Sequence, residues 1–357
     1  MNARTMIRTL LTITVVMLLL PAPPTHADAV RVGDLYQAQI AVADKTAPAR
    51  EQAIRTALKI VLVKLTGDRS AAIRPALLEL VDNAASYVQQ FSYREDRDSA
   101  TAVGQTTLRL LLNVKFDETT LSNGLREAGV SLWGNERPAV LVWLLLQQGR
   151  QRFIASPEST PELIAILQKR AGERGISLIF PLMDLQDNST IQAGDIRGGI
   201  AEPVLRASRR YQSEVILTAS LSSRYAGLWE STWTAYIDQA VADIWSTESD
   251  MVALTLEEGL DILVDSLAHR YVSEGGLGRF NLSISNVSSA ARYAGLLRYL
   301  ESLSAVTALD VVEVQGSWIT LSLLAHGGDK AVIQAISLGR VLRPTADARL
   351  NSYEMSP

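Results

Sequence analysis

The spacing of hydrophobic residues changes several times between residues 34 and 129, and each change predicts an element. Alternation of apolar and polar side chains indicates half-buried strands, and recurrence every three or four residues indicates helices. The predicted elements are, in order, a strand at 36–42, a helix ending at Gly67, a helix beginning at Pro75, strands at 91–93 and 108–116, and a short helix ending near Gly129. This βααββα order predicts an α+β module over residues 28–137, with helices on one face of an antiparallel sheet.

A continuous run of eight apolar residues, Ala139 to Leu146, opens the next stretch. The run is too short to span a membrane, and a strand buried on both faces produces such a pattern, which indicates a parallel or mixed sheet covered by helices. Further strands are predicted at 176–180, 215–221 and 229–237, and helices from Pro161, at 200–211 and at 254–271. The order β-α-β-α-β-β-α predicts a two-layer or three-layer α/β module over residues 138–275.

A glycine-rich segment at 275–278 indicates a linker to a third module. Strand, helix, strand, strand and helix patterns follow at 280–285, 288–303, 311–314, 318–324 and 329–338. A βαββα unit of this size is typical of a ferredoxin-like fold, predicted here over residues 276–343. Residues 344–357 show no periodicity, and we expect them to be disordered.

The first 27 residues predict a secretory signal peptide. Arg4 and Arg8 precede an apolar run from Leu10 to Leu20, and three prolines and the tripeptide Thr25-His26-Ala27 follow. These features predict cleavage between Ala27 and Asp28 and a periplasmic location. The alternative is a membrane anchor, but the run has eleven residues, whereas a membrane-spanning helix needs about 20.

Composition narrows the possible classes of protein. The chain has no cysteine, which excludes disulfides, thiol catalysis and thiolate metal sites. Acylation at the new N-terminus needs a cysteine, so Asp28 in that position argues against a lipid anchor. The formal net charge is −4, with no basic block, which argues against nucleic acid as a partner. No other apolar run has membrane-spanning length, so we expect the mature chain to be soluble, without a transmembrane segment.

Motifs for common catalytic chemistry do not occur in the sequence. It contains no H-E-x-x-H, no G-x-S-x-G, no phosphate-binding G-x-x-x-x-G-K-[ST] and no G-x-G-x-x-G after a strand. A Ser–His–Asp triad stays open, because its members lie far apart in any chain. We therefore expect no metal, no cofactor and no enzymatic activity.

The best candidate for a ligand crevice is the polar loop 184–199. In parallel or mixed sheets, ligands bind outside the carboxyl ends of the strands, where this loop is predicted to lie. Its candidate residues are Asp184, Asp187, Asn188, Asp195 and Arg197. Asp184 with Asp187 or Asp195 is also the candidate carboxylate pair for a glycoside hydrolase. The alternative interpretation is a plain surface loop rich in Asx turns.

Aromatic residues on one predicted strand provide a second candidate. Trp229 and Trp233 lie on the same face of the strand at 229–237 and are able, in principle, to stack on a sugar or an aromatic ligand. Ala235 and Ile237 share that face, which favours the alternative that both tryptophans belong to the core.

Three stretches resemble an uncharacterised proteobacterial periplasmic family, domain-of-unknown-function family 2066. They are DLYQAQIAVADKTAPAREQAIRTALKIVLVKLTGD at 34–68, LIFPLMDLQDNSTIQAGDIRGGI at 178–200 and SRRYQSEVILTASL at 208–221. The resemblance implies an envelope protein whose α/β modules serve in assembly or as adaptors, with no catalytic residue to transfer.

The leading hypothesis is a non-enzymatic adaptor or assembly protein of the cell envelope that binds envelope proteins or peptidoglycan. The alternative is a periplasmic small-ligand or glycan-binding protein that uses the 184–199 loop, with a hydrolase as a third possibility. Convergence of Asp184, Asp195 and Arg197 in one pocket favours a ligand site, and their separation favours the adaptor.

Overall fold

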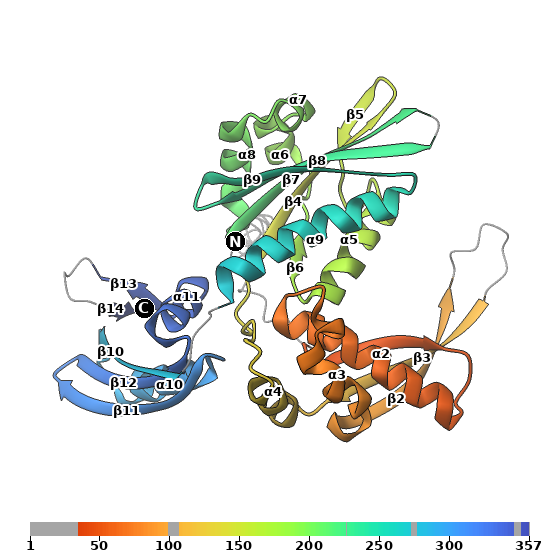
Figure 1. The fold of residues 1–357 in the computed structure, drawn as a ribbon. Coiled ribbons are helices and arrows are strands. Elements are labelled where there is room, and N and C mark those ends of the chain that lie inside the picture. The colour runs from red at the N-terminus through yellow and green to blue at the C-terminus, as the bar shows by residue number, and fades with distance from the viewer. Residues whose placement is uncertain (1–34, 99–106, 226, 273–276, 346–350, 357) are drawn as a thin grey trace, which may run out of the picture.

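The computed structural model describes residues 35–98, 107–225, 227–272, 277–345 and 351–356, arranged as three sheets that each have helices and a core of their own (Figure 1). The mixed α/β and α+β class predicted from the sequence is confirmed. Within these ranges no helix combines the length and the apolar character needed to cross a membrane. The predicted signal peptide and its cleavage site at Ala27–Asp28 lie outside the described residues.

The first module follows the predicted βααββα order. Its antiparallel sheet has the order β1-β3-β2, built from β1 (Gln37–Val42), β2 (Val88–Asp98) and β3 (Thr107–Phe116). The helices are α2 (Ala47–Thr66), α3 (Pro75–Asp82) and α4 (Glu118–Glu127), with 3₁₀ turns at Ala71–Ile73 and Ala84–Tyr87. Leu112, Val114 and Phe116 are buried in the core with these helices, as the period-two pattern predicted.

The second module is a three-layer α/β structure around a sheet of order β5-β4-β7-β8-β9, with β6 paired to β4. Its strands are β4 (Ala139–Gln148), β5 (Gln151–Ile154), β6 (Ser177–Ile179), β7 (Val215–Tyr225), β8 (Leu228–Ile237) and β9 (Ala240–Ser249). Its helices are α5 (Pro161–Arg174), α6 (Leu185–Thr190), α7 (Ala193–Arg197), α8 (Ala201–Ser208) and α9 (Val252–Tyr271). Strands β6 and β7 run parallel to β4.

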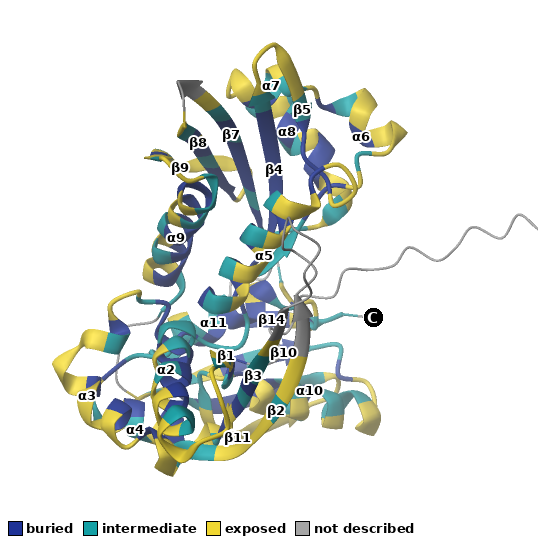
Figure 2. Cartoon of the chain, turned by 90° about the vertical axis from the view of Figure 1, so that its right-hand side faces the viewer, coloured by how far each residue is buried: buried dark blue, intermediate teal, exposed yellow. Residues whose placement is uncertain are grey.

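Strand β4 is buried on both faces, as its apolar run predicted (Figure 2). Its even-numbered residues, from Val140 to Leu146, share a core with α5 and α9. Leu141, Trp143 and Leu145 point to the other side, into a core with the helices α7 and α8. The 184–199 segment, predicted as a loop, therefore forms two short helices of the third layer.

The third module contains the predicted βαββα unit and continues beyond it. The sheet order is β11-β12-β10-β14-β13, and both helices contribute to its core. The elements are β10 (Leu277–Ser285), α10 (Ala290–Ser302), β11 (Val306–Gln315), β12 (Trp318–His326), α11 (Gly328–Leu338), β13 (Leu342–Pro344) and β14 (Ser352–Met355).

The prediction of a disordered tail at 344–357 is wrong for Ser352–Met355. Strand β14 lies inside the sheet, parallel to β10, and Tyr353 is buried. Arg292 fixes its end by donating hydrogen bonds to the carbonyl oxygens of Met355 (3.0 Å) and Ser356 (2.7 Å). Backbone pairing and one arginine hold this strand, and neither leaves a periodic hydrophobic signal.

Arg137 joins the first two modules at the end of the connecting segment. Its buried guanidinium donates hydrogen bonds to five carbonyl oxygens, those of Lys64, Trp133, Gly134, Arg174 and Gly175. It also lies 4.3 Å from the centroid of the Trp133 ring. Burial lowers the pKa of Arg137 to about 9, still above neutral pH, so the side chain donates these bonds as a cation. A cation is favourable here because two helices, α2 and α5, end at this point.

Arg174, at the end of α5, provides a second link between the modules. Its side chain is 1% exposed, and it pairs with Asp261 (3.1 Å) and Asp265 (2.6 Å) on α9. The same guanidinium donates to the carbonyl oxygen of Gly67, directly after α2 (2.8 Å). Arg69 and Arg170 extend the network along the acidic stripe of α9. Because Arg174 and Asp261 are both almost fully buried, breaking that pair is costly even where forming it gains little.

We predict that Arg137→Met lowers the free energy of unfolding by about 3 kcal/mol, because buried carbonyl oxygens then lose their donors. Urea denaturation measures the change. The control is Arg298→Met, an exposed arginine on α10, for which the expected change is within about 0.5 kcal/mol. Equal effects of the two substitutions would contradict a structural role for Arg137.

Candidate functional site

The predicted site residues Asp184, Asp187 and Asn188 meet at the start of α6. Asp184 caps the helix by accepting the backbone N–H of Asp187 (3.0 Å) and pairs through both oxygens with Arg210 (2.8 and 2.9 Å). Asp187 is 1% exposed and accepts hydrogen bonds from the Tyr211 hydroxyl (2.6 Å) and Arg210 (3.2 Å). Both carboxylates are therefore committed to partners within the fold.

The other two loop candidates do not join this cluster. Asp195 belongs to the first turn of α7, where it accepts the backbone N–H of Gln192 (2.8 Å), and Arg197 is exposed at the end of the same helix. In the parts of the chain that the structure describes, no hydrogen bond or ion pair links either residue to Asp184. The convergence of Asp184, Asp195 and Arg197 that would favour a ligand site is therefore not seen.

Electrostatics also argue against a general-acid role for Asp184. The hydrogen bond from Arg210, reinforced by the backbone N–H of Asp187, lowers the pKa of Asp184 to about 2. Burial, followed by the hydrogen bond to Asp187, raises the pKa of Tyr211 to about 12. Near neutral pH, Asp184 is therefore ionised and Tyr211 remains a donor, which is the arrangement of a stable ion-pair and hydrogen-bond cluster.

The backbone conformation of Met183 explains why the turn before α6 needs these hydrogen bonds. Met183 has a φ of +52°, a conformation that is uncommon for residues other than glycine. Its N–H donates to Asp187 (3.0 Å), and its carbonyl accepts from Asn188 (2.7 Å). Met183 and Asn188 also line a shallow pocket of about 550 Å³ beside β5. The predicted candidates thus hold a strained turn between β6 and α6.

The expected crevice at the strand ends is occupied by other elements. Strand β6 ends beside Leu141, well before β4 ends at Gln148. After Gln148 the chain turns directly into β5, whose Ile154 pairs with Leu145 of β4. The periodicity of the sequence showed neither β5 nor β9, because both strands are exposed and have little apolar alternation.

Trp233 lies in the core and Trp229 at its margin. Trp233 is fully buried and stacks on Trp245, with ring centroids 6.2 Å apart and planes inclined by 2°. Its indole N–H donates to the Ser231 hydroxyl (2.6 Å), and Trp229 packs partly buried against the same core. Gly259 on α9 leaves room for the Trp233 ring, because a Cβ at this position would clash with the indole. Trp233 is therefore not accessible to a sugar.

The C-terminal sheet ends in an exposed apolar edge, the β11 edge (Val306–Gln315). Val311, Val312 and Val314 have 42%, 57% and 59% of their surface exposed. Strand β11 is the last strand of the sheet and pairs on one side, with β12 (Figure 1). The valines were recognised as a strand from the sequence, but only the strand order reveals that the strand is an unpaired edge.

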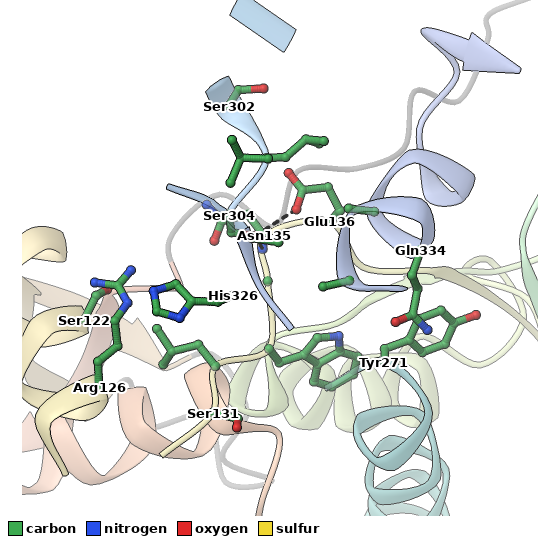
Figure 3. A pocket seen from close by; sticks show the side chains of 18 of the residues that line it. Ser122, Arg126, Ser131, Asn135, Glu136, Tyr271, Ser302, Ser304, His326 and Gln334 are labelled. Atoms are coloured by element: carbon green, nitrogen blue, oxygen red, sulfur yellow. Dashed lines mark hydrogen bonds between the residues drawn. The ribbon is translucent and has the colours of Figure 1, made fainter. Parts of the chain in front are cut away.

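A pocket of about 680 Å³ lies where the three modules meet, here called the junction pocket (Figure 3). Its wall comes from α4, the connecting segment 129–136, the end of α9 and the third module. Ser304 links the two sides: it accepts the backbone N–H of Asn135 (3.1 Å) and donates to Glu136 (2.9 Å). The sequence did not predict this pocket, because the residues that line it are spread along the chain between positions 36 and 338.

Arg126 and His326 lie next to each other at one side of the junction pocket, and Glu136 lies with Ser304 at another (Figure 3). Burial, followed by the nearby Arg126 charge, lowers the pKa of His326. Across the described ranges, no group of three or more His, Asp or Glu side chains is arranged to hold a metal ion.

We predict that Arg210→Met raises the pKa of Asp184 from about 2 toward its ordinary value of 3.8. An acid with a lowered pKa stabilises the fold above its unfolded pKa, and this contribution disappears as the pH falls through the folded value. The variant should therefore lose less stability between pH 4 and pH 2 than the parent protein.

Carboxyl ¹³C NMR titration of Asp184 measures the shift. Arg206→Met is the matched control, since Arg206 pairs with Glu202 on the exposed side of α8 (2.6 Å). It should leave the Asp184 titration unchanged. An unaltered Asp184 pKa in Arg210→Met would contradict the assignment.

Comparison with known proteins gives a family match for the first module. A family model described as "Domain of unknown function (DUF8605)" matches residues 29–134. The expected membership of domain-of-unknown-function family 2066 is therefore wrong, because the match to a different family includes the stretch 34–68 that carried the resemblance. No curated protein shows a significant match to the chain.

Two solved structures show a weak likeness to the chain. One is lipoprotein GNA1162 from Neisseria meningitidis, with 12% identity, a TM-score of 0.23, and 38% of this chain and 96% of that chain covered. The other is the LpoB C-terminal domain from Salmonella enterica, with 15% identity, a TM-score of 0.22, and coverage of 37% and 93%. Scores this low do not establish a shared fold.

Proposed function

We propose that this protein is an exported, non-enzymatic adaptor of the cell envelope that binds a partner protein by strand addition at the β11 edge. The observation that carries the proposal is that three of four consecutive residues, 311–314, are exposed valines on an unpaired edge strand. An edge strand is a template for pairing with another chain, and the valines give β11 an apolar surface beside its two acids, Asp310 and Glu313.

The backbone of the β11 edge favours an extended segment as the occupant. An edge strand presents a row of N–H and C=O groups, and an added strand pairs with them while its alternate side chains enter neighbouring sites. Asp310 and Glu313 are exposed on the same strand, and Asp310 already pairs with Arg279 (3.1 Å). The expected partner segment is therefore extended, carries apolar side chains that cover the valines, and has a basic side chain that faces Glu313.

The arrangement of the 184–199 segment supports an adaptor over the ligand-binding and hydrolase alternatives. Its acids cap helices and pair with Arg210, and its candidate residues do not share one pocket. Burial of Trp233 removes one of the two side chains expected to stack on a sugar, and Trp229 is partly buried, so a protein is favoured over peptidoglycan as the partner. The location in the envelope rests on the predicted signal peptide, and Asp28 in place of a cysteine disfavours a lipid anchor.

We expect the double substitution Val312→Lys/Val314→Lys to reduce recovery of the partner about tenfold, a loss of about 1.4 kcal/mol of binding free energy. Lysines on the edge expose charge where apolar side chains pack and repel a basic partner strand. In vivo crosslinking followed by mass spectrometry measures recovery, and thermal unfolding should show little change, because both positions are exposed.

The matched control is Val241→Lys/Ile244→Lys on β9, the edge of the central sheet, where both side chains are also exposed. This variant should retain the partner. The proposal is wrong if no envelope protein is crosslinked above background, or if both double variants lose the partner equally.

Export gives a separate prediction. Protein recovered from the periplasm of a Gram-negative host should begin at Asp28, and replacing Ala27 by arginine should block cleavage, because the −1 position requires a small side chain. N-terminal sequencing of the periplasmic fraction measures both. Intact chain that begins at Met1 in the cytosol would contradict export.

A further inference from the structure

The junction pocket has the size and position of a ligand site. Its volume of about 680 Å³ falls within the range of roughly 300–1,000 Å³ that is usual for small-molecule pockets, which occur preferentially between domains. Its wall combines polar side chains with an apolar set contributed by the first and third modules: Val130, Leu132, Leu303, Val306 and Leu338. A ligand in this pocket would contact more than one module at once.

Trp133, in the wall of the pocket, has an unsatisfied hydrogen-bond donor. The residue is 2% exposed, and its indole N–H has no hydrogen-bond partner among the described residues. Three other tryptophans use this group within the fold: Trp143 donates to Ser208 (2.9 Å), Trp233 to Ser231 (2.6 Å) and Trp245 to the carbonyl oxygen of Gly259 (3.1 Å).

A buried donor without a partner costs about 1–3 kcal/mol, and buried indole N–H groups usually have one. This N–H is closed off from solvent, so a ligand in the pocket contacts the Trp133 ring rather than its N–H, and the N–H resonance reports on occupation of the pocket.

Charged side chains give the pocket two ends of opposite sign. Arg126 and His326 lie together on one side, and Glu136 lies apart from them beside Ser304 (Figure 3). Arg126 donates one hydrogen bond to Asn123 on its own helix (2.8 Å), and its guanidinium has further N–H donors. Glu136 accepts the Ser304 hydroxyl, and a carboxylate accepts several more hydrogen bonds. Glu118 and Glu301 also line the wall.

We infer that the junction pocket binds a short apolar peptide with free termini. Its carboxylate pairs with Arg126 beside His326, its ammonium group pairs with Glu136, and its side chains pack on the apolar wall next to Trp133. Capture of peptide termini by charged and polar groups is a common mode of recognition. The bound peptide also bridges the first and third modules and so stabilises their relative position. This site is independent of the β11 edge.

The test uses the full chain and trileucine as the probe. The six tryptophans give six indole N–H resonances in a ¹⁵N-correlated NMR spectrum, and Trp133→Phe identifies the one that belongs to Trp133. Titration with trileucine should shift that resonance with saturation. N-acetyl-trileucine lacks the ammonium group and trileucine amide lacks the carboxylate, and each should bind about tenfold more weakly, as expected for the loss of one charge-assisted hydrogen bond.

Substitution of Arg126 tests whether this residue binds the carboxylate of the peptide. Arg126→Gln should weaken trileucine about tenfold and leave the already weak trileucine amide unchanged, because both changes remove the same interaction. Arg126 is exposed on α4, so the variant is expected to fold. Arg298→Gln, on an exposed arginine of α10 outside the pocket, is the control and should bind like the parent. The inference is overturned if trileucine does not shift the Trp133 resonance. It is also overturned if the parent protein binds the blocked peptides, and Arg126→Gln binds trileucine, as tightly as the parent protein binds trileucine.

Discussion

The relative position of the first two modules depends on two buried guanidinium groups. Arg137 gathers carbonyl oxygens at the ends of α2 and α5, and Arg174 connects the end of α5 with α9 and with Gly67. Because Arg137 also holds the carbonyl oxygens of Trp133 and Gly134, it fixes the segment that forms one wall of the junction pocket. A structural interaction thus creates the space in which we infer that a ligand binds.

The polar cluster at the start of α6 was a candidate ligand site in the sequence, and in the structure it stabilises the fold. Asp184, Asp187 and Asn188 do come together, as a ligand site requires, but their partners are Arg210, Tyr211 and the strained backbone of Met183. Their hydrogen-bonding capacity is used to hold a turn and to orient a helix of the third layer. The binding surfaces that we propose are elsewhere, at the β11 edge and in the junction pocket.

The sheet of the third module has two unlike edge strands. On one side of β10 the chain returns as β14 and then β13, and this edge is short and ends in Pro344. On the other side the sheet ends at β11, whose valines face solvent. This asymmetry makes the β11 edge available to a partner segment while the module keeps its own core intact.

The sequence by itself determined the local elements of the fold. The even-numbered apolar residues of β3, the doubly buried run of β4 and the helical stripes of α2 and α9 follow from interactions between near neighbours, which leave a periodic pattern. Tertiary structure alone decided the rest. Strand β14 is held by backbone pairing with β10. Arg137 donates to carbonyl oxygens of residues up to 73 positions away. The junction pocket is lined by residues of all three modules. Such contacts depend on how distant segments pack, and no spacing along the chain records them.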